Sequence, residues 1–421
     1  MTVRSGLSPE RVVLTNGVAV TTVETHAIPA VAISAVVQAG SVYDPPLLPG
    51  LAHFASRTLD RGTPGRSADA IAWELDSRGV SLAVTINRHV LSVTCQCLAE
   101  DVEPVLAVMA DLLGQAQYPD DQVTGRRAEI VTAIRQDEEN PAAMANEGLL
   151  RLLYPGHPYS TRPRGSVADA QRVTPDDLRA FHHRHVTPAG CSLVVVGDVD
   201  GGAVAAVAAR AFDAWPAREP ASLPLPPVVP ATTRQRLVVP MPGKPQADIA
   251  YGFTTILRAD PSYYACWVME VILGRYALGG RIGDRIRERE GLAYYVFSAL
   301  DANIVPGPLA FRAGVNPANV DRAIAIIDDE LARFAAEGPT DKEVDDTKRY
   351  LIGSLPRTLE TNAKIANFLQ TAAFFGLGAD YDRRMADLLR AVTRADVHEA
   401  ARRWLDPSRA AVVIAGDYEA A

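Results

Sequence analysis

The sequence has few cysteines, no long apolar run and no excess of positive charge. Four cysteines in 421 residues are too few for a disulfide framework. No stretch reaches the roughly 18 uninterrupted apolar residues that a transmembrane helix needs. Residues 1–10 also lack the apolar region of a secretory signal. These absences predict a cytoplasmic protein that contacts no membrane.

The charge balance argues against a nucleic-acid partner. Lys and Arg number 42 and Asp and Glu number 50, which gives a formal net charge of −8. A general nucleic-acid binder needs a basic surface to neutralise phosphates. The apolar fraction of 48% and the charged fraction of 22% are those of an ordinary globular chain. The sequence also contains neither a G-x-G-x-x-G motif nor a P-loop, so we expect no nucleotide site.

Two of the cysteines stand close together in a strand-like run. Cys95 and Cys97 alternate with polar residues, so both side chains point to the same face of a strand. The pair could bind a soft metal, or it could be two small buried residues. No further Cys or His stands nearby at ligand spacing, which favours burial.

A proline-rich segment near the midpoint divides the chain. Residues 215–230 contain six prolines, which can hold neither a helix nor a central strand. We predict an N-terminal half over residues 1–215, an extended linker over 216–231, and a C-terminal half over 232–421. Since 421 residues exceed a single hydrophobic core, a division of this kind is expected.

The two halves contain an internal repeat. Residues 174–198 align without gaps with residues 393–417. Each copy begins with a threonine that can cap a helix, Thr174 or Thr393, and continues through a proline turn into a short apolar strand that ends at Gly-Asp. The repeat predicts two homologous halves of about 200 residues each.

The remaining pattern indicates an α+β fold. Residues 11–23 resemble a hairpin with Asn16-Gly17 at its turn. Further strands are expected at 30–39 and 80–98, and helices at 50–59, 68–77, 104–115 and 119–139. We predict two α/β sandwich halves, each with a mostly antiparallel sheet and helices packed on one face.

One segment of the first half carries a resemblance to a known family. Residues 39–63 contain His53-Phe-Ala-Ser-Arg57 and resemble the active-site region of the pitrilysin/insulinase (inverzincin) zinc peptidases. That family has the inverted motif H-x-x-E-H, in which two histidines bind zinc and the glutamate is the general base. A second glutamate about 76 residues later completes the ligand set. The resemblance covers essentially the whole chain and implies the fold of mitochondrial processing peptidase.

The zinc motif is degenerate in this chain. His53 occupies the first ligand position, but Ser56 stands at the position of the base and Arg57 at that of the second ligand. The third ligand position falls on Ala133. A lone histidine cannot hold Zn²⁺, and a guanidinium would repel it. We therefore expect no metal or other cofactor in this chain, which leaves zinc to a partner subunit.

The second half retains the other family signature. Residues 278–298 begin Leu-Gly-Gly and contain Gly-Leu-Ala-Tyr-Tyr-Val at 291–296, close to the family's L-G-G…L-R-E-K-R-G-L-A-Y-S-V. In the family, an arginine and a tyrosine seven residues apart bind the substrate carbonyl and stabilise the oxyanion. They correspond to Arg287 and Tyr294. The alternative is that Arg287 is one of several exposed helix cations and Tyr294 a core residue.

A histidine cluster offers a second possible metal site. His182, His183 and His185 stand at the end of a predicted helix. The aligned residues 401–404 of the repeat contain no histidine, so we expect a solvated helix end here.

Together these residues predict a non-catalytic subunit. Some bacterial family members have two subunits, of which one carries H-x-x-E-H and the other carries the Arg/Tyr pair with a degenerate zinc motif. The resemblance implies a heterodimer with a zinc-bearing subunit, inactive alone, that acts on short peptides or leader peptides. The alternatives are a structural or peptide-binding scaffold, and a stand-alone peptidase in which Glu129, Glu138 or Glu139 replaces the lost ligands.

Overall fold

The chain forms two compact units. The computed structural model describes residues 6–222, 224–275 and 279–419. Within these residues, the first unit contains the chain up to Ile134 together with Arg162–Pro224 and Leu355–Arg383. The second contains Arg135–Thr161, Leu225–Ser354 and the chain from Arg384 onward. We call them the N-terminal and C-terminal units.

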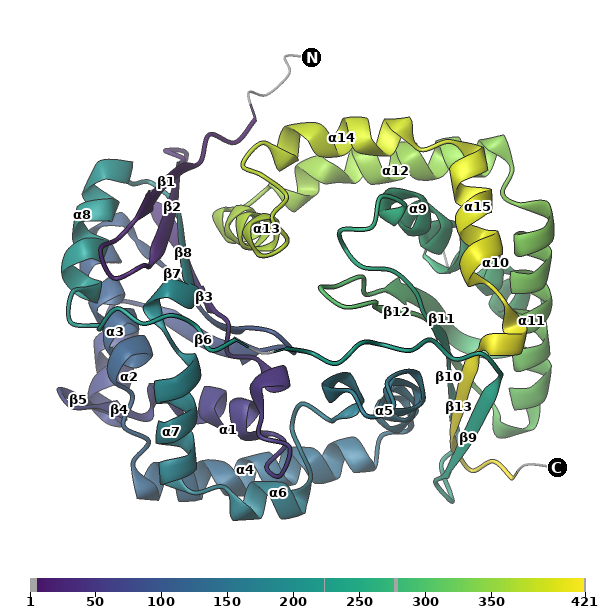
Figure 1. The fold of residues 1–421 in the computed structure, drawn as a ribbon, viewed down its shortest axis with the longest axis horizontal. Coiled ribbons are helices and arrows are strands. Elements are labelled where there is room, and N and C mark those ends of the chain that lie inside the picture. The colour runs from purple at the N-terminus through teal and green to yellow at the C-terminus, as the bar shows by residue number, and fades with distance from the viewer. Residues whose placement is uncertain (1–5, 223, 276–278, 420–421) are drawn as a thin grey trace. The chain divides into compact units, whose positions relative to one another are not determined.

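A six-stranded sheet forms the centre of the N-terminal unit (Figure 1). Its order is β1-β2-β8-β3-β7-β6, and only the β2–β8 pair is parallel. The Asn-Gly hairpin joins β1 to β2, and Gly17 adopts the left-handed conformation (φ +100°) that this turn requires. The strands are β1 (Glu10–Val13), β2 (Ala19–Glu24), β3 (Ala30–Val37), β6 (Ser81–Ile86), β7 (Leu91–Leu98) and β8 (Cys191–Gly197). A two-stranded ribbon is also present, β4 (Gly62–Thr63) with β5 (Arg66–Ser67).

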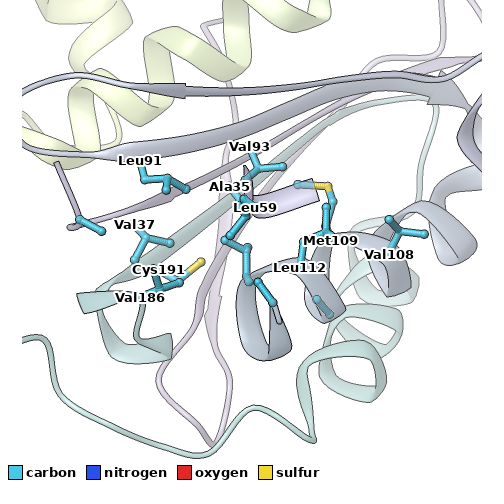
Figure 2. Close-up of a cluster of buried hydrophobic side chains, with 14 of the residues drawn as sticks. Ala35, Val37, Leu59, Leu91, Val93, Val108, Met109, Leu112, Val186 and Cys191 are labelled. Atoms are coloured by element: carbon cyan, nitrogen blue, oxygen red, sulfur yellow. The ribbon is translucent and has the colours of Figure 1, made fainter. Parts of the chain in front are cut away.

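Helices cover one face of this sheet and enclose the main core. Figure 2 shows part of that core, where side chains of β3 and β7 meet Leu59, Met109 and Leu112. Cys95 and Cys97 are both buried in this core, as predicted. The helices from this part of the chain are α1 (Leu51–Thr58), α2 (Ala68–Asp76), α3 (Val102–Gln115), α4 (Asp120–Glu138), α6 (Val167–Arg172), α7 (Pro175–His185) and α8 (Gly201–Phe212).

The C-terminal unit repeats this topology. Its sheet has the order β9-β13-β10-β12-β11, with one parallel pair, β9–β13. The order matches β2-β8-β3-β7-β6 strand for strand. The strands are β9 (Gln235–Pro240), β10 (Ala247–Thr254), β11 (Ala293–Leu300), β12 (Pro308–Val315) and β13 (Ala411–Gly416). The helices are α9 (Tyr263–Gly274), α10 (Gly280–Gly283), α11 (Val320–Glu337), α12 (Asp341–Thr358), α14 (Tyr381–Ala391) and α15 (Arg394–Trp404). The prediction of two α+β halves is therefore confirmed.

Each sheet also carries a helix on its opposite face, and that helix comes from the other half of the sequence. In the N-terminal unit, α13 (Asn362–Phe374) packs on β3 and β8. Val194 and Val196 contact α13, whereas the alternate residues Leu193 and Val195 face the main core. In the C-terminal unit, α5 (Pro141–Leu153) packs on β10 and β13. The prediction that helices cover only one face of each sheet is therefore incomplete, because α13 and α5 cover part of the other face.

The proline-rich segment has the expected local structure. Residues 216–222 and 224–231 form neither helix nor strand. Leu223, within the predicted linker, lies outside the described residues. Across the described part of the chain, no helix combines the length and the hydropathy that a membrane span requires.

The histidine cluster at the end of α7 differs from the prediction. His183 is exposed, but His182 and His185 are 6% and 8% exposed. His182 lies with Nδ1 2.9 Å from the Tyr118 hydroxyl, and the His185 ring packs against the Phe181 ring. Burial lowers the pKa of each imidazole to about 4. The prediction of a solvated helix end is therefore wrong, because two of the three histidines are buried in the core.

These buried histidines predict a loss of stability in acid. Their pKa in the unfolded chain is about 6.5, so below that pH the unfolded state binds protons that the folded state does not. The unfolding free energy should fall as the pH drops from 6.5 toward 4, by about 3 kcal/mol per histidine at pH 4. Denaturant titrations at pH 7 and pH 4.5 measure this change. His185→Phe should reduce the difference, and His183→Gln is the matched control that should leave it unchanged. An equal pH dependence in His185→Phe and the original protein would contradict the assignment.

Candidate functional site

The degenerate zinc motif lies on α1. The half-buried Asp44 carboxylate accepts hydrogen bonds from the backbone N–H groups of Gly50 (2.8 Å) and Ala52 (2.7 Å), which fixes the start of this helix. Burial raises the pKa of Asp44 to about 7. His53, the third residue of α1, is half-buried, and the buried Ser56 donates its hydroxyl to the His53 carbonyl at 2.7 Å. The serine hydroxyl is therefore engaged with its own helix.

Arg57 and Ala133 complete the four motif positions. The Arg57 guanidinium lies 4.0 Å from the Glu129 carboxylate of α4, which also contacts Arg126. Ala133 is half-buried one turn further along the same helix. Glu129 thus forms ion pairs with two arginines, and the Glu139 carboxylate lies 2.9 Å from Lys244 Nζ. Within the described ranges no three or more His, Cys, Asp or Glu side chains gather into a possible metal site.

These residues do not fit a zinc ion. Zinc in a catalytic site takes three protein ligands, usually imidazole nitrogens and carboxylate oxygens. The four positions provide one imidazole, one hydroxyl bonded to backbone, one guanidinium and one methyl group. A positive charge at a ligand position opposes a divalent cation directly. No reaction step can be assigned to a metal at α1.

The second signature lies in the C-terminal unit, where two of its arginines pair with the carboxylates of Glu343, Asp329 and Glu330. Arg281 pairs with Glu343 at 2.5 and 2.6 Å, and its guanidinium holds the pKa of that carboxyl at about 2 despite burial. Arg285 pairs with Asp329 and, at 3.3 Å, with Glu330 of α11. Leu278, the first residue of the signature, lies outside the described residues.

Arg287 is positioned differently from these anchors. It lies in η6 (Asp284–Arg289), a π-helical turn, a geometry often found at functional sites. Its side chain is 43% exposed, and it forms an ion pair with the neighbouring Glu288 at 3.6 Å. Its guanidinium is therefore presented to solvent, whereas Arg281 and Arg285 are 19% and 26% exposed.

Tyr294 lies at an irregularity in β11. Ala293 pairs with Val315 and Tyr295 with Gly314, so Tyr294 is the extra residue of a β-bulge. Tyr294 is 85% exposed, while the next tyrosine, Tyr295, donates its hydroxyl to the buried Asp248. Bulges re-aim a side chain and are common next to active sites. The alternative of Tyr294 as a core residue is wrong.

Sequence reasoning missed the carboxylate beneath the signature. Glu330 is 0% exposed, and the guanidinium groups of Arg281, Arg285 and Arg333 surround it. A usable signal is its spacing: Glu330 lies three residues after Ile327 and four before Phe334, within the apolar stripe of α11. A charge in such a stripe needs partners, and here two of the three partners, Arg281 and Arg285, belong to the signature.

Comparison with known proteins identifies the family of both halves of the chain. Residues 19–162 match the family model described as Insulinase (Peptidase family M16), and residues 172–351 match the one described as Peptidase M16 inactive domain. The chain belongs to the M16 family of pitrilysin/insulinase peptidases.

Several relatives are similar along most of their length. An uncharacterized zinc protease of Mycobacterium tuberculosis is 27% identical, covering 97% of this chain and 94% of the relative. A Helicobacter pylori protein named a non-peptidase homolog is 21% identical, covering 83% and 80%. The crystal structure of a peptidase M16 inactive domain from Pseudomonas fluorescens is 25% identical, with a TM-score of 0.91 over 98% of this chain and 99% of that one.

Proposed function

We propose that this chain is the non-catalytic subunit of a two-subunit zinc metallopeptidase. Its partner would be a family member that carries H-x-x-E-H, and Arg287 and Tyr294 would complete the active site of that partner. The observation that carries this proposal is the bulge at Tyr294, which leaves the phenol 85% exposed in a segment that also presents Arg287. The four motif positions, three on α1 and Ala133 on α4, support it, because they do not fit zinc.

The chemistry of the pair suits peptide hydrolysis. A guanidinium and a phenol donate hydrogen bonds without needing a change of protonation at neutral pH. Donors fixed in this way stabilise negative charge that develops on a carbonyl oxygen. Both β6 and β11 are edge strands, and an extended peptide can pair with such an edge. These features favour short or unfolded peptides, including leader peptides, as substrates.

We also infer a cytoplasmic location for the complex. The four cysteines, Cys95, Cys97, Cys191 and Cys266, are free and buried. Burial raises the pKa of each thiol, so the thiols stay protonated and unreactive. Free thiols of this kind are typical of a reducing compartment.

Reconstitution tests the proposal. The purified chain alone should contain no zinc and cleave no peptide, and the same chain mixed with its H-x-x-E-H partner should be active. Metal content is measured by atomic emission and activity with quenched fluorescent peptides. Full activity of the partner without this chain would overturn the proposal. Stoichiometric zinc in this chain alone would instead favour a stand-alone peptidase.

The scaffold alternative makes a different prediction for the complex. A structural or peptide-binding subunit would be needed for assembly but not for chemistry. The double variant Arg287→Ala, Tyr294→Phe would then assemble and retain full activity.

A further inference from the structure

The sheet of the C-terminal unit carries an arginine on the face where α5 packs. Phe297 of β11 pairs with Arg312 of β12, so their side chains point to the same face of the sheet. The Arg312 guanidinium lies 5.7 Å from the centroid of the Phe297 ring. Phe297 is 40% exposed and Tyr295, two residues earlier on the same face, is half-buried. This strip of β11 and β12 is therefore open to solvent beside the arginine.

Among the described residues, Arg312 has no acidic partner. Its Nη2 donates a hydrogen bond to the side-chain oxygen of Asn146 on α5, a neutral acceptor. Its Nε atom is buried and has no acceptor among the described residues. None of the described Asp or Glu carboxylates lies within 4.0 Å of the guanidinium. Burial lowers the pKa of Arg312, as expected for a cation that leaves water without gaining a counter-ion.

The acid on the same sheet face is already engaged. Asp248 accepts a hydrogen bond from the Tyr295 hydroxyl at one carboxylate oxygen and from the Gln246 side chain at the other, at 3.2 Å. Both of its oxygens are therefore held by other groups. A half-buried guanidinium without a carboxylate costs free energy unless a ligand provides one.

We propose that Arg312 binds a carboxylate of the bound peptide, while Phe297 and Tyr295 contact apolar atoms of the same peptide. Arginine suits this role because its planar fork of donors matches the two oxygens of a carboxylate. The carboxylate comes from an acidic side chain or from the peptide C-terminus. The inference rests on the proposed function only in that the chain binds peptides, and it needs neither the partner nor catalysis.

Peptide binding to the full chain tests this assignment. Labelled peptides of one sequence are prepared with Glu or Gln at a central position, and each with a free or an amidated C-terminus. Fluorescence anisotropy should show one carboxylate-bearing form binding about tenfold tighter than its neutral counterpart, the size of a charge-assisted hydrogen bond. The arm that shows the preference identifies the source of the carboxylate.

Two substitutions locate the effect. Arg312→Gln should abolish the preference and leave the affinity for the neutral peptide unchanged. Asn146→Asp keeps the arginine but places a carboxylate beside it, so it should abolish the preference as well. Arg349→Gln, an exposed arginine on α12 whose side chain is 78% accessible, is the matched control and should retain the preference. Melting temperatures verify that each variant folds.

Clear outcomes would overturn the assignment. Equal binding of charged and neutral peptides, no binding at all, or a preference that persists in both Arg312→Gln and Asn146→Asp would each do so. Should Arg312→Gln fail to fold, the peptide series on the original protein and on Asn146→Asp still decides. A complex that is insensitive to Arg287→Ala would reject the catalytic contribution and leave this carboxylate preference intact.

Discussion

Replacing Arg287 by alanine is expected to lower kcat/KM of the reconstituted complex by about 10²-fold or more, the usual cost of one oxyanion donor. The guanidinium is 43% exposed and its ion pair is with an adjacent glutamate, so its loss removes a donor and disturbs little packing. Tyr294→Phe should have a similar effect, since it deletes only the hydroxyl of a side chain that is 85% exposed. Steady-state kinetics with a quenched peptide measure both.

The matched control is Arg289→Ala in the same turn. Arg289 is 72% exposed and pairs with Asp284 at 2.7 Å, so it shares the location and charge of Arg287 but has no proposed role. It should leave kcat/KM within about twofold of the original complex, because exposed ion pairs contribute little. Size-exclusion chromatography verifies that each variant still assembles. Unchanged kinetics in both Arg287→Ala and Tyr294→Phe would establish the scaffold alternative.

Replacing Glu330 by glutamine is expected to destabilise the C-terminal unit by about 3–5 kcal/mol, the cost of removing one partner from a buried charge cluster. The carboxylate is fully buried, and Arg285 and Arg281 reach it at 3.3 and 3.6 Å. Glutamine has the same shape, so the loss reports charge rather than packing. The melting temperature should fall by about 10 °C.

Asp329→Asn is the comparison for this change. Asp329 pairs with the same Arg285, but its side chain is 64% exposed. Its loss should leave the melting temperature nearly unchanged, since water screens the pair. Calorimetry of both variants measures the difference. A Glu330→Gln protein within about 1 kcal/mol of the original would show that the arginines find other partners, and that Glu330 does not anchor the signature.

Local structure followed from the sequence because local rules set it. The Asn16-Gly17 turn, the alternating run around Cys95 and the threonine caps at Thr174 and Thr393 each act within a few residues. Both threonines form capping boxes, with Asp177 and Asp396. The repeat then extended these local assignments to the second half.

The packing of elements that are distant in the sequence could not be predicted from the same local patterns. An amphipathic helix reveals which of its faces is buried, but not the sheet that covers it, so the positions of α5 and α13 were not predicted. His182 and His185 were assigned by residue type, although each follows an apolar residue by four positions, Leu178 and Phe181, on the buried stripe of α7.

The site residues also fall into two groups, those that a sequence motif identified and those that only the structure revealed. The resemblance to the family selected Arg287 and Tyr294, but alternation along a strand alone could not decide between Tyr294 and Tyr295. The bulge decides it, because one extra residue in β11 reverses which tyrosine reaches solvent. Arg312 and Glu330 gave no motif, since their significance depends on which charges the fold leaves near them.

The exchange of α5 and α13 has a consequence for how the chain folds during synthesis. Asn362 donates a hydrogen bond to the carbonyl of Ala30, and Gln370 donates to that of Ser34, contacts that join residues more than 300 positions apart. The first sheet therefore emerges from the ribosome long before the helix that covers its second face. Until then Val194 and Val196 are exposed, an apolar surface that invites aggregation or chaperone binding. A fragment that ends at the linker lacks α13, so we expect it to keep that surface uncovered.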